Sequence, residues 1–201
     1  GHLCSEFLTL NEPNVYAYNG YMLGLWPPGM KSMNAAFAVM SNMATAHIKA
    51  YRLIHDMRRS MGFHDTKASS AIGMRAFVPK SSGNPLDRRS AATAEKLFQQ
   101  LMAQAMLTGD FHGPLRNFGR DRRGAYGDFL AVNYYRRSTI GVFGESAMPR
   151  SSKNDLGWEI YPTGLISCCQ WLRQIAPLPI YITENGVCDL GDAFRSRFIY
   201  E

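Results

Sequence analysis

Hydrophobic side chains recur at intervals of three or four residues along much of the chain. The longest such stripe begins at Met33, passes through Phe37, Met40 and Ala44, and continues to Met61. This spacing predicts an amphipathic helix over residues 32–62. Shorter stripes predict two more helices, over residues 90–109 and 162–176, and residues 192–201 are expected to form a fourth.

Short apolar runs lie between these stripes. They cover residues 6–10, 67–74, 129–134 and 180–183, and their lengths and flanking polar, Gly or Pro residues predict four strands. The segments that end at Gly29 and Pro85 are rich in Gly and Pro, so we expect loops there. A strand followed by a helix, four times in succession, favours an α/β fold with a parallel sheet.

Composition is that of an ordinary globular protein. Of the 201 residues, 46% are hydrophobic and 12% aromatic, which excludes disorder across the whole chain. The net charge of +6 comes largely from Arg doublets that are scattered over predicted loops and helix ends. A nucleic-acid-binding protein would gather such charge on one face, so we expect a solvated basic surface and no nucleic-acid partner.

The cysteines, at positions 4, 168, 169 and 188, have no spacing typical of a zinc site. We therefore expect free thiols in a reducing compartment and no bound metal. The sequence shows no signal peptide and no apolar run long enough to cross a membrane. These observations predict a cytoplasmic protein without a membrane partner.

Two glutamates follow predicted strands: Glu12 comes soon after the first strand, and Glu184 directly follows the fourth. In parallel α/β folds the carboxyl ends of the strands meet at one rim, so both carboxylates are expected there. Such a pair can cleave a glycoside, because one carboxyl protonates the leaving oxygen while the other attacks the anomeric carbon or activates water. Asn11 could hold a sugar hydroxyl, and Tyr135 could hydrogen-bond a carboxylate. A glutamate before Pro or Asn-Gly is also a common turn residue, and spacing alone leaves both interpretations open.

Several motifs together resemble those of glycoside hydrolase family 1. They are Thr-Leu-Asn-Glu-Pro at residues 9–13, Asn-Tyr-Tyr at 133–135, Gly-Trp-Glu-Ile-Tyr-Pro at 157–162 and Tyr-Ile-Thr-Glu-Asn-Gly at 181–186. They occur in the family's order, and Pro27-Pro28-Gly29, Ala46-His47 and Asp192-x-x-Arg195 fit as well. The resemblance therefore covers essentially the whole chain.

The resemblance implies a (β/α)8 TIM barrel enzyme of the β-glucosidase type, which hydrolyses β-glucosides and related β-glycosides with retention. By position, Glu12 would be the general acid/base and Glu184 the nucleophile. Asn11 would contact the sugar 2-hydroxyl, Tyr135 would hydrogen-bond the nucleophile, and Asn133 would belong to the substrate-binding residues. No metal or organic cofactor is implied, and the implied partner is a β-glucoside or related carbohydrate.

In the family, the acid/base ends barrel strand four and the nucleophile ends strand seven. Glu12 and Glu184 lie near the two ends of this chain, so we expect one partial barrel domain over residues 1–201, made of strands four to seven. The family's sugar-binding residues on strands one, three and eight would then be absent. The alternative is a catalytically inactive half barrel, whose open sheet edges favour self-association or a complementary fragment.

Overall fold

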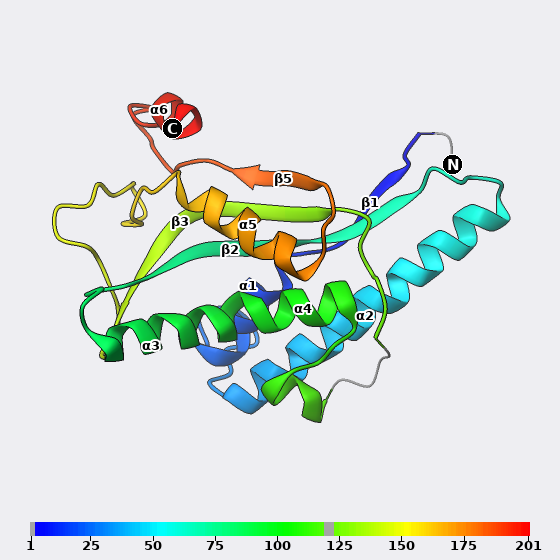
Figure 1. Ribbon diagram of the computed structural model, residues 1–201, viewed down its shortest axis with the longest axis horizontal. Helices are drawn as coiled ribbons and strands as arrows, with labels where there is room; N and C mark the ends of the chain where they lie inside the picture. Colours follow the sequence, from blue (N-terminus) through cyan, green and yellow to red (C-terminus); the bar gives the residue numbers. More distant parts are fainter. Residues whose placement is uncertain (1–2, 119–122) are drawn as a thin grey trace.

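The computed structural model describes residues 3–118 and 123–201, so Arg122 of one Arg doublet lies outside the described residues. One sheet runs through them, formed by β1 (Glu6–Asn11), β2 (Lys67–Pro79), β3 (Leu130–Gly141), β4 (Gly144–Ser146) and β5 (Ile180–Asn185). β1, β2, β3 and β5 are parallel, as predicted, and β2 and β3 form the middle of the sheet (Figure 1). β5 pairs with the first half of β3, and the short β4 pairs antiparallel with its end.

Helices connect the parallel strands. Between β1 and β2 lie α1 (Pro13–Ala17), a π-helical turn (Tyr18–Met22) and the long α2 (Met33–Ser60). Between β2 and β3 lie α3 (Pro85–Glu95), a π-helical turn (Lys96–Gln100), α4 (Leu101–Thr108) and a 3-10 turn (Gly113–Asn117). α5 (Gly164–Ile175) precedes β5, and α6 (Arg195–Tyr200) follows it. The predicted alternation of strand and helix is thus present.

Two predicted loops are partly regular structure. The stretch after Glu12 was expected to be a loop, but Pro13 begins α1, because proline is well suited to the first turn of a helix. The helix expected from Ser90 begins at Pro85, where the Asn84 side chain accepts a hydrogen bond from the backbone of Leu86 (3.0 Å).

Strand and helix ends also differ from expectation. β2 and β3 extend to Pro79 and Gly141, because they pair with each other from Ala71 and Ala131 to Pro79 and Ile140. The last helix begins at Arg195 rather than at residue 192, since Asp192 has a left-handed backbone with φ of 52°. Pairing between distant segments thus sets the ends of β2 and β3, whereas a local turn sets the start of α6.

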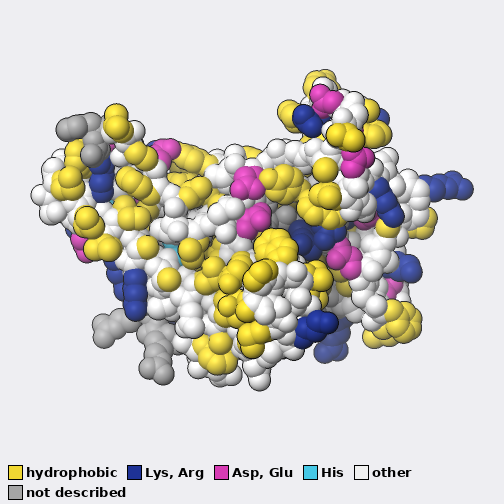
Figure 2. Space-filling view, turned by 180° about the vertical axis from the view of Figure 1, so that it is seen from behind, with side chains coloured by type: hydrophobic (Ala, Val, Ile, Leu, Met, Phe, Trp, Pro, Cys, Tyr) yellow, Lys and Arg dark blue, Asp and Glu magenta, His cyan; other side chains and the backbone are white. Residues whose placement is uncertain are grey.

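Side chains alternate between the two faces of the sheet. Ile72, Met74, Leu130 and Val132 point to the face on which α4 and α5 pack, where they form a buried apolar cluster. The neighbouring positions on β2 and β3 point to the opposite face, and there Ala71, Phe129 and Ala131 form a small cluster with Tyr181 of β5. Figure 2 views the molecule from the side opposite to α5 and shows acidic side chains among hydrophobic ones.

No helix in the described part of the chain is long and apolar enough to cross a membrane. Within the same residues, β1 pairs only with β2, and β5 pairs only with β3, so both strands have an open edge. Leu8 on β1 and Ile182 on β5 are 47% and 44% exposed, respectively. Exposed apolar side chains on strands with an open edge favour pairing with another chain.

Candidate active site

Glu12 lies at the junction of β1 and α1. Its backbone N–H donates to the carbonyl of Ala71 on β2 (2.8 Å), and its own carbonyl accepts from Val15 (3.0 Å) and Tyr16 (3.1 Å) on α1. Its backbone angles are left-handed, φ 47° and ψ 49°, which non-glycine residues seldom adopt and which are enriched at functional sites. The backbone bonds to β2 and α1 therefore fix the direction in which this carboxyl points.

Asn133 on β3 links the ends of β1 and β5 through its side-chain amide. The amide nitrogen donates to Asn11 Oδ1 (3.0 Å) and Glu12 Oε1 (3.2 Å), while the amide oxygen accepts from Thr183 Oγ1 (2.6 Å). Asn133 itself is buried. Asn11 is the last residue of β1, Glu12 follows it, and Thr183 belongs to β5. The side chain of Asn133 therefore connects the end of β1, next to Glu12, with the strand that contains Glu184.

Glu184 is placed by β3. It is the register partner of Asn133, and the hydroxyl of Tyr135 donates to its Oε2 (2.8 Å). Burial, followed by this bond to Glu184, raises the pKa of Tyr135 to about 12. The phenol therefore keeps its proton at neutral pH and remains a hydrogen-bond donor to the carboxylate.

Burial raises the pKa of Glu12 above its usual range, and the negative charge of Glu184 raises it further. The hydrogen bond from Asn133 and the positive charge of Arg75 act in the opposite direction but do not cancel the rise. The two carboxyl groups are thus close enough to influence each other. A carboxyl that keeps its proton to higher pH is suited to donate it to a leaving group.

Two residues beside Glu12, Asn14 and Gly73, were not among the predicted site residues. Asn14 Nδ2 donates to the carbonyl of Gly73 (2.8 Å), and the Gly73 N–H donates back to Asn14 Oδ1 (3.2 Å). A Cβ atom on Gly73 would lie 3.0 Å from Glu12 Oε1 and 2.6 Å from Val15 Cγ2. Only glycine therefore leaves room for the carboxyl. A glycine within a strand was the available signal, because it often marks a close approach.

A cavity of about 180 Å³ opens beside Glu12. Asn133 and Tyr135 contribute to its wall, and Arg75 and Arg136 line it as well. The remaining lining is largely aromatic or apolar and consists of Val15, Asn19, Trp26, Gly73, Met74, Phe98 and Trp158. Arg75 was not among the predicted site residues, because the predicted strand ended at residue 74, whereas β2 continues to Pro79.

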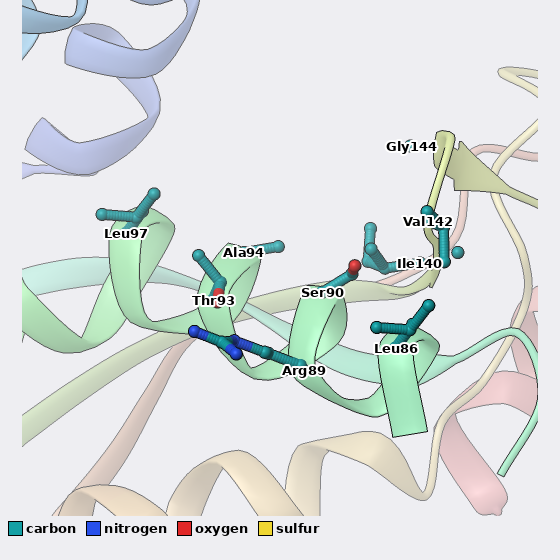
Figure 3. Close-up of a pocket in the computed structure, with 10 residues that line it drawn as sticks. Leu86, Arg89, Ser90, Thr93, Ala94, Leu97, Ile140, Val142 and Gly144 are labelled. Carbon is teal, nitrogen blue, oxygen red and sulfur yellow. The ribbon is translucent and has the colours of Figure 1, made fainter. Parts of the chain in front are cut away.

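A second, larger hollow of about 450 Å³ lies between α3 and the turn that joins β3 to β4 (Figure 3). Leu86 and Ser90 of α3 and Leu97 of the following π-helical turn line it together with Ile140 and Val142. Its lining contains no carboxylate, imidazole or thiol. Within residues 3–118 and 123–201, no three His, Cys, Asp or Glu side chains are grouped as a metal ion would require. The hollow of Figure 3 therefore offers no carboxyl pair of the kind that Glu12 and Glu184 form.

The five residues predicted for the site are neighbours: Asn11 and Glu12 lie at the end of β1, Glu184 lies near the end of β5, and Asn133 and Tyr135 lie in the first half of β3, which continues to Gly141. Glu12, Asn11 and Asn133 share one hydrogen-bond network, and Tyr135 bonds Glu184 next to it. The side-chain amide of Asn133 donates to Asn11 and Glu12, so both of its N–H groups already have protein acceptors. Thr183, on the strand that carries Glu184, completes this network.

Comparison with known proteins gives relatives of one kind. The chain is 27% identical to the β-galactosidase of Sulfolobus acidocaldarius, over 98% of this chain and 42% of the relative, and 25% identical to β-glucosidase A of Thermotoga maritima, over 92% and 45%. Among solved structures, a β-glycosidase from Pyrococcus horikoshii is 30% identical with a TM-score of 0.75, over 94% of this chain and 44% of that one. A β-glucosidase from Exiguobacterium marinum, 22% identical with a TM-score of 0.80, shares the fold.

The chain spans about half the length of these relatives, 42% to 51%. Its parallel sheet with helices is accordingly an incomplete α/β barrel of the kind those glycosidases contain. The family model described as glycosyl hydrolase family 1 matches residues 1–198, which is nearly all of the chain. The protein therefore belongs to glycosyl hydrolase family 1.

Proposed function

We propose that this chain carries the catalytic carboxylate pair of a retaining β-glycosidase that hydrolyses terminal β-D-glycosidic bonds. Glu12 acts as the general acid/base and Glu184 as the nucleophile. The observation that carries the proposal is the hydrogen-bond network in which Asn133 contacts Glu12 and Thr183 while Tyr135 donates to Glu184, and the raised pKa of Glu12 is consistent with it. The relatives include both a β-galactosidase and a β-glucosidase, so the proposal names β-D-glycosides as the substrate class without choosing between glucose and galactose.

The reaction follows from these roles. Glu184 attacks the anomeric carbon as Glu12 gives its proton to the leaving oxygen, and a covalent glycosyl-enzyme forms. The negative charge of Glu184 disappears in that intermediate, so the repulsion that kept the proton on Glu12 is relieved. Glu12 is then ionised and can take a proton from the water that releases the sugar. Two displacements at one carbon retain its configuration.

Neighbouring side chains have supporting roles in the proposal. Tyr135 donates to Glu184 and holds the attacking oxygen in one orientation. Asn133 orients Glu12 and Asn11 together, and Asn11, which is exposed at the rim, contacts the sugar 2-hydroxyl. No cofactor takes part in this chemistry, since the two carboxylates supply the acid, the base and the nucleophile.

Hydrolysis of 4-nitrophenyl β-D-glucoside and β-D-galactoside by the chain tests the proposal. We expect slow hydrolysis, because the sugar-binding residues that the family places on other strands are outside this chain. Glu184→Gln should reduce the rate by at least about a thousandfold, as expected for a lost nucleophile. Glu6→Gln is the matched control, because Glu6 is a glutamate at the opposite end of β1 whose carboxyl accepts from Lys67 and Tyr181. Hydrolysis that survives Glu184→Gln would refute the assignment.

The role of Glu12 has its own test in the choice of leaving group. A 2,4-dinitrophenolate leaves without protonation, whereas a phenolate needs an acid. Glu12→Gln should therefore slow cleavage of phenyl β-D-glucoside far more than formation of the glycosyl-enzyme from the dinitrophenyl glucoside. Equal losses with both substrates would mean that Glu12 is not the acid. Absence of hydrolysis by the unaltered chain would favour the alternative of an inactive half barrel.

The open edges of β1 and β5 support a second part of the proposal, pairing with another copy of the chain or with a complementary fragment. Each strand has one partner in the described residues, and Leu8 and Ile182 are exposed there. Sedimentation should then show a larger species as the concentration rises, and Leu8→Lys should weaken it. A monomer at all concentrations would contradict self-association.

A further inference from the structure

Arg75 carries a charge without an ionic partner among residues 3–118 and 123–201. Its backbone bonds Gln99 in both directions, at 2.9 Å and 3.2 Å, but its guanidinium makes no hydrogen bond or salt bridge in this part of the chain. The guanidinium lies over the ring of Phe98, 4.2 Å from its centroid, and 5.9 Å from that of Tyr18. These rings hold the group in place by cation–π contacts and leave its N–H donors unused.

The neighbouring Arg136 differs in this respect. It forms a salt bridge of 2.7 Å with Glu145 and lies over Trp158, 5.2 Å from the ring centroid. Burial, and then the charge of Arg136, lowers the pKa of Arg75 to about 10, so the guanidinium is still charged at neutral pH. The cavity beside Glu12 therefore contains one positive charge that no salt bridge compensates. A partly buried cation of this kind is stabilised by an anionic ligand.

The position of the cavity indicates which part of a substrate would occupy it. Glu12 lines the cavity, whereas Glu184 does not. In a retaining glycosidase the general acid faces the leaving group, while the nucleophile approaches from the opposite side of the sugar. Trp26 and Trp158 supply aromatic walls on the same side. A flat aromatic leaving group thus fits the surroundings of Arg75 better than a second sugar does.

We propose that Arg75 binds a carboxylate on the leaving group, so that the preferred substrates are β-glycosides of aromatic carboxylic acids. The inference rests on the proposed function for the side of Glu12 that the leaving group occupies. A monoanion fits better than a phosphate dianion, because one uncompensated positive charge is present and Glu12 becomes negative as it protonates the leaving oxygen. The planar fork of a guanidinium also matches a carboxylate in geometry.

Binding of two small compounds tests the inference without hydrolysis. Phenylacetate and phenylacetamide have nearly the same shape and differ in charge, and tryptophan fluorescence reports binding because Trp26 and Trp158 line the cavity. Phenylacetate should bind at least about tenfold more tightly, as expected for one charge-assisted contact. Arg75→Gln should remove this preference. Arg59→Gln should keep it, since Arg59 is an exposed arginine paired with Asp56.

The comparison of phenylacetate with phenylacetamide in the unaltered chain tests the inference even where Arg75→Gln fails to fold. Arg75→Lys keeps the positive charge but loses the planar guanidinium, so it should retain a reduced preference for phenylacetate. Equal affinity for the acid and the amide, or no binding of either, would overturn the inference. Tighter binding of phenyl phosphate than of phenylacetate would also overturn it. Selective binding without hydrolysis would refute only the proposed function, whereas hydrolysis without selectivity would refute only the role of Arg75.

Discussion

Gly73→Ala adds one methyl group directly beside the carboxyl of Glu12. The new Cβ would lie 2.6 Å from Val15 Cγ2, well inside van der Waals contact, and 3.0 Å from Glu12 Oε1. Val15 is on α1 and β-branched, so its side chain has little freedom to rotate away. The carboxyl of Glu12 is more mobile but can retreat only by weakening its bond to Asn133 (3.2 Å).

Overpacking of this kind typically costs about 1–3 kcal/mol of unfolding free energy. A displacement of the acid by about 1 Å should also reduce hydrolysis by roughly a hundredfold. Removing Val15 Cγ2 should relieve the closer clash, so the Gly73→Ala/Val15→Ala pair should be less destabilised than the sum of its single variants by about 1 kcal/mol or more. Activity should recover less than stability, since the contact with Glu12 is still present.

Urea unfolding of the four species measures the coupling, and hydrolysis of an aryl glycoside measures the activity. Gly83→Ala is the matched control, because a Cβ on Gly83 would have its nearest neighbour at 4.0 Å. Its unfolding free energy should change by no more than about 0.5 kcal/mol. Additive effects of Gly73→Ala and Val15→Ala would show that the close approach between β2 and α1 does not limit this site.

Three further predictions follow from the pKa shifts and the network. Burial lowers the pKa of His47 to about 4 from an ordinary value near 6.5, so the unfolded state takes up the proton first as pH falls. Between pH 7 and pH 5 the chain should lose about 2 kcal/mol of stability that the His47→Gln variant does not lose, as urea unfolding at both pH values can show. Glu184→Gln removes a repelling charge, so carbon-13 NMR titration should find a lower pKa for Glu12 in that variant, and an unchanged value would mean that the carboxyls do not interact. Asn133→Ala should reduce hydrolysis of phenyl glucosides, which need the acid, more than that of dinitrophenyl glucosides; equal losses would separate Asn133 from Glu12.

The sequence predicted the parallel strands and placed Glu12 and Glu184 at one rim, because both depend on local patterns: apolar runs, breakers and residues directly after strands. It did not predict the extension of β2 to Pro79, since that depends on pairing with β3, a segment more than fifty residues away in the chain. Gly73 was missed for a related reason. Its need for glycine arises from Val15 and Glu12, which approach it only in the folded sheet.

The hydrogen-bond partners of Asn133 could not be predicted from the sequence either. An asparagine in the Asn-Tyr-Tyr motif indicates a polar contact but not its partners, and these are Asn11, Glu12 and Thr183, from two other strands. The resemblance to a family supplied the expected role of Asn133 as a substrate contact. In the structure its amide nitrogen donates to Asn11 and Glu12, so the proposed role of Asn133 includes orienting those two side chains.

Irregular pairing explains how residues on strands at opposite sides of the sheet come together. β1 and β5 are separated by β2 and β3, so a flat sheet would hold Glu12 and Glu184 far apart. The pairing shifts between Leu8 and Asn11 on β1, between Met74 and Ala76 on β2, and between Val132 and Asn133 on β3. Each shift lies next to the site, and such irregularities bend strands and increase their twist. The sheet therefore curls at the level of the carboxylates, and Asn133 can reach Glu12 on one side while it lies beside Glu184 on the other.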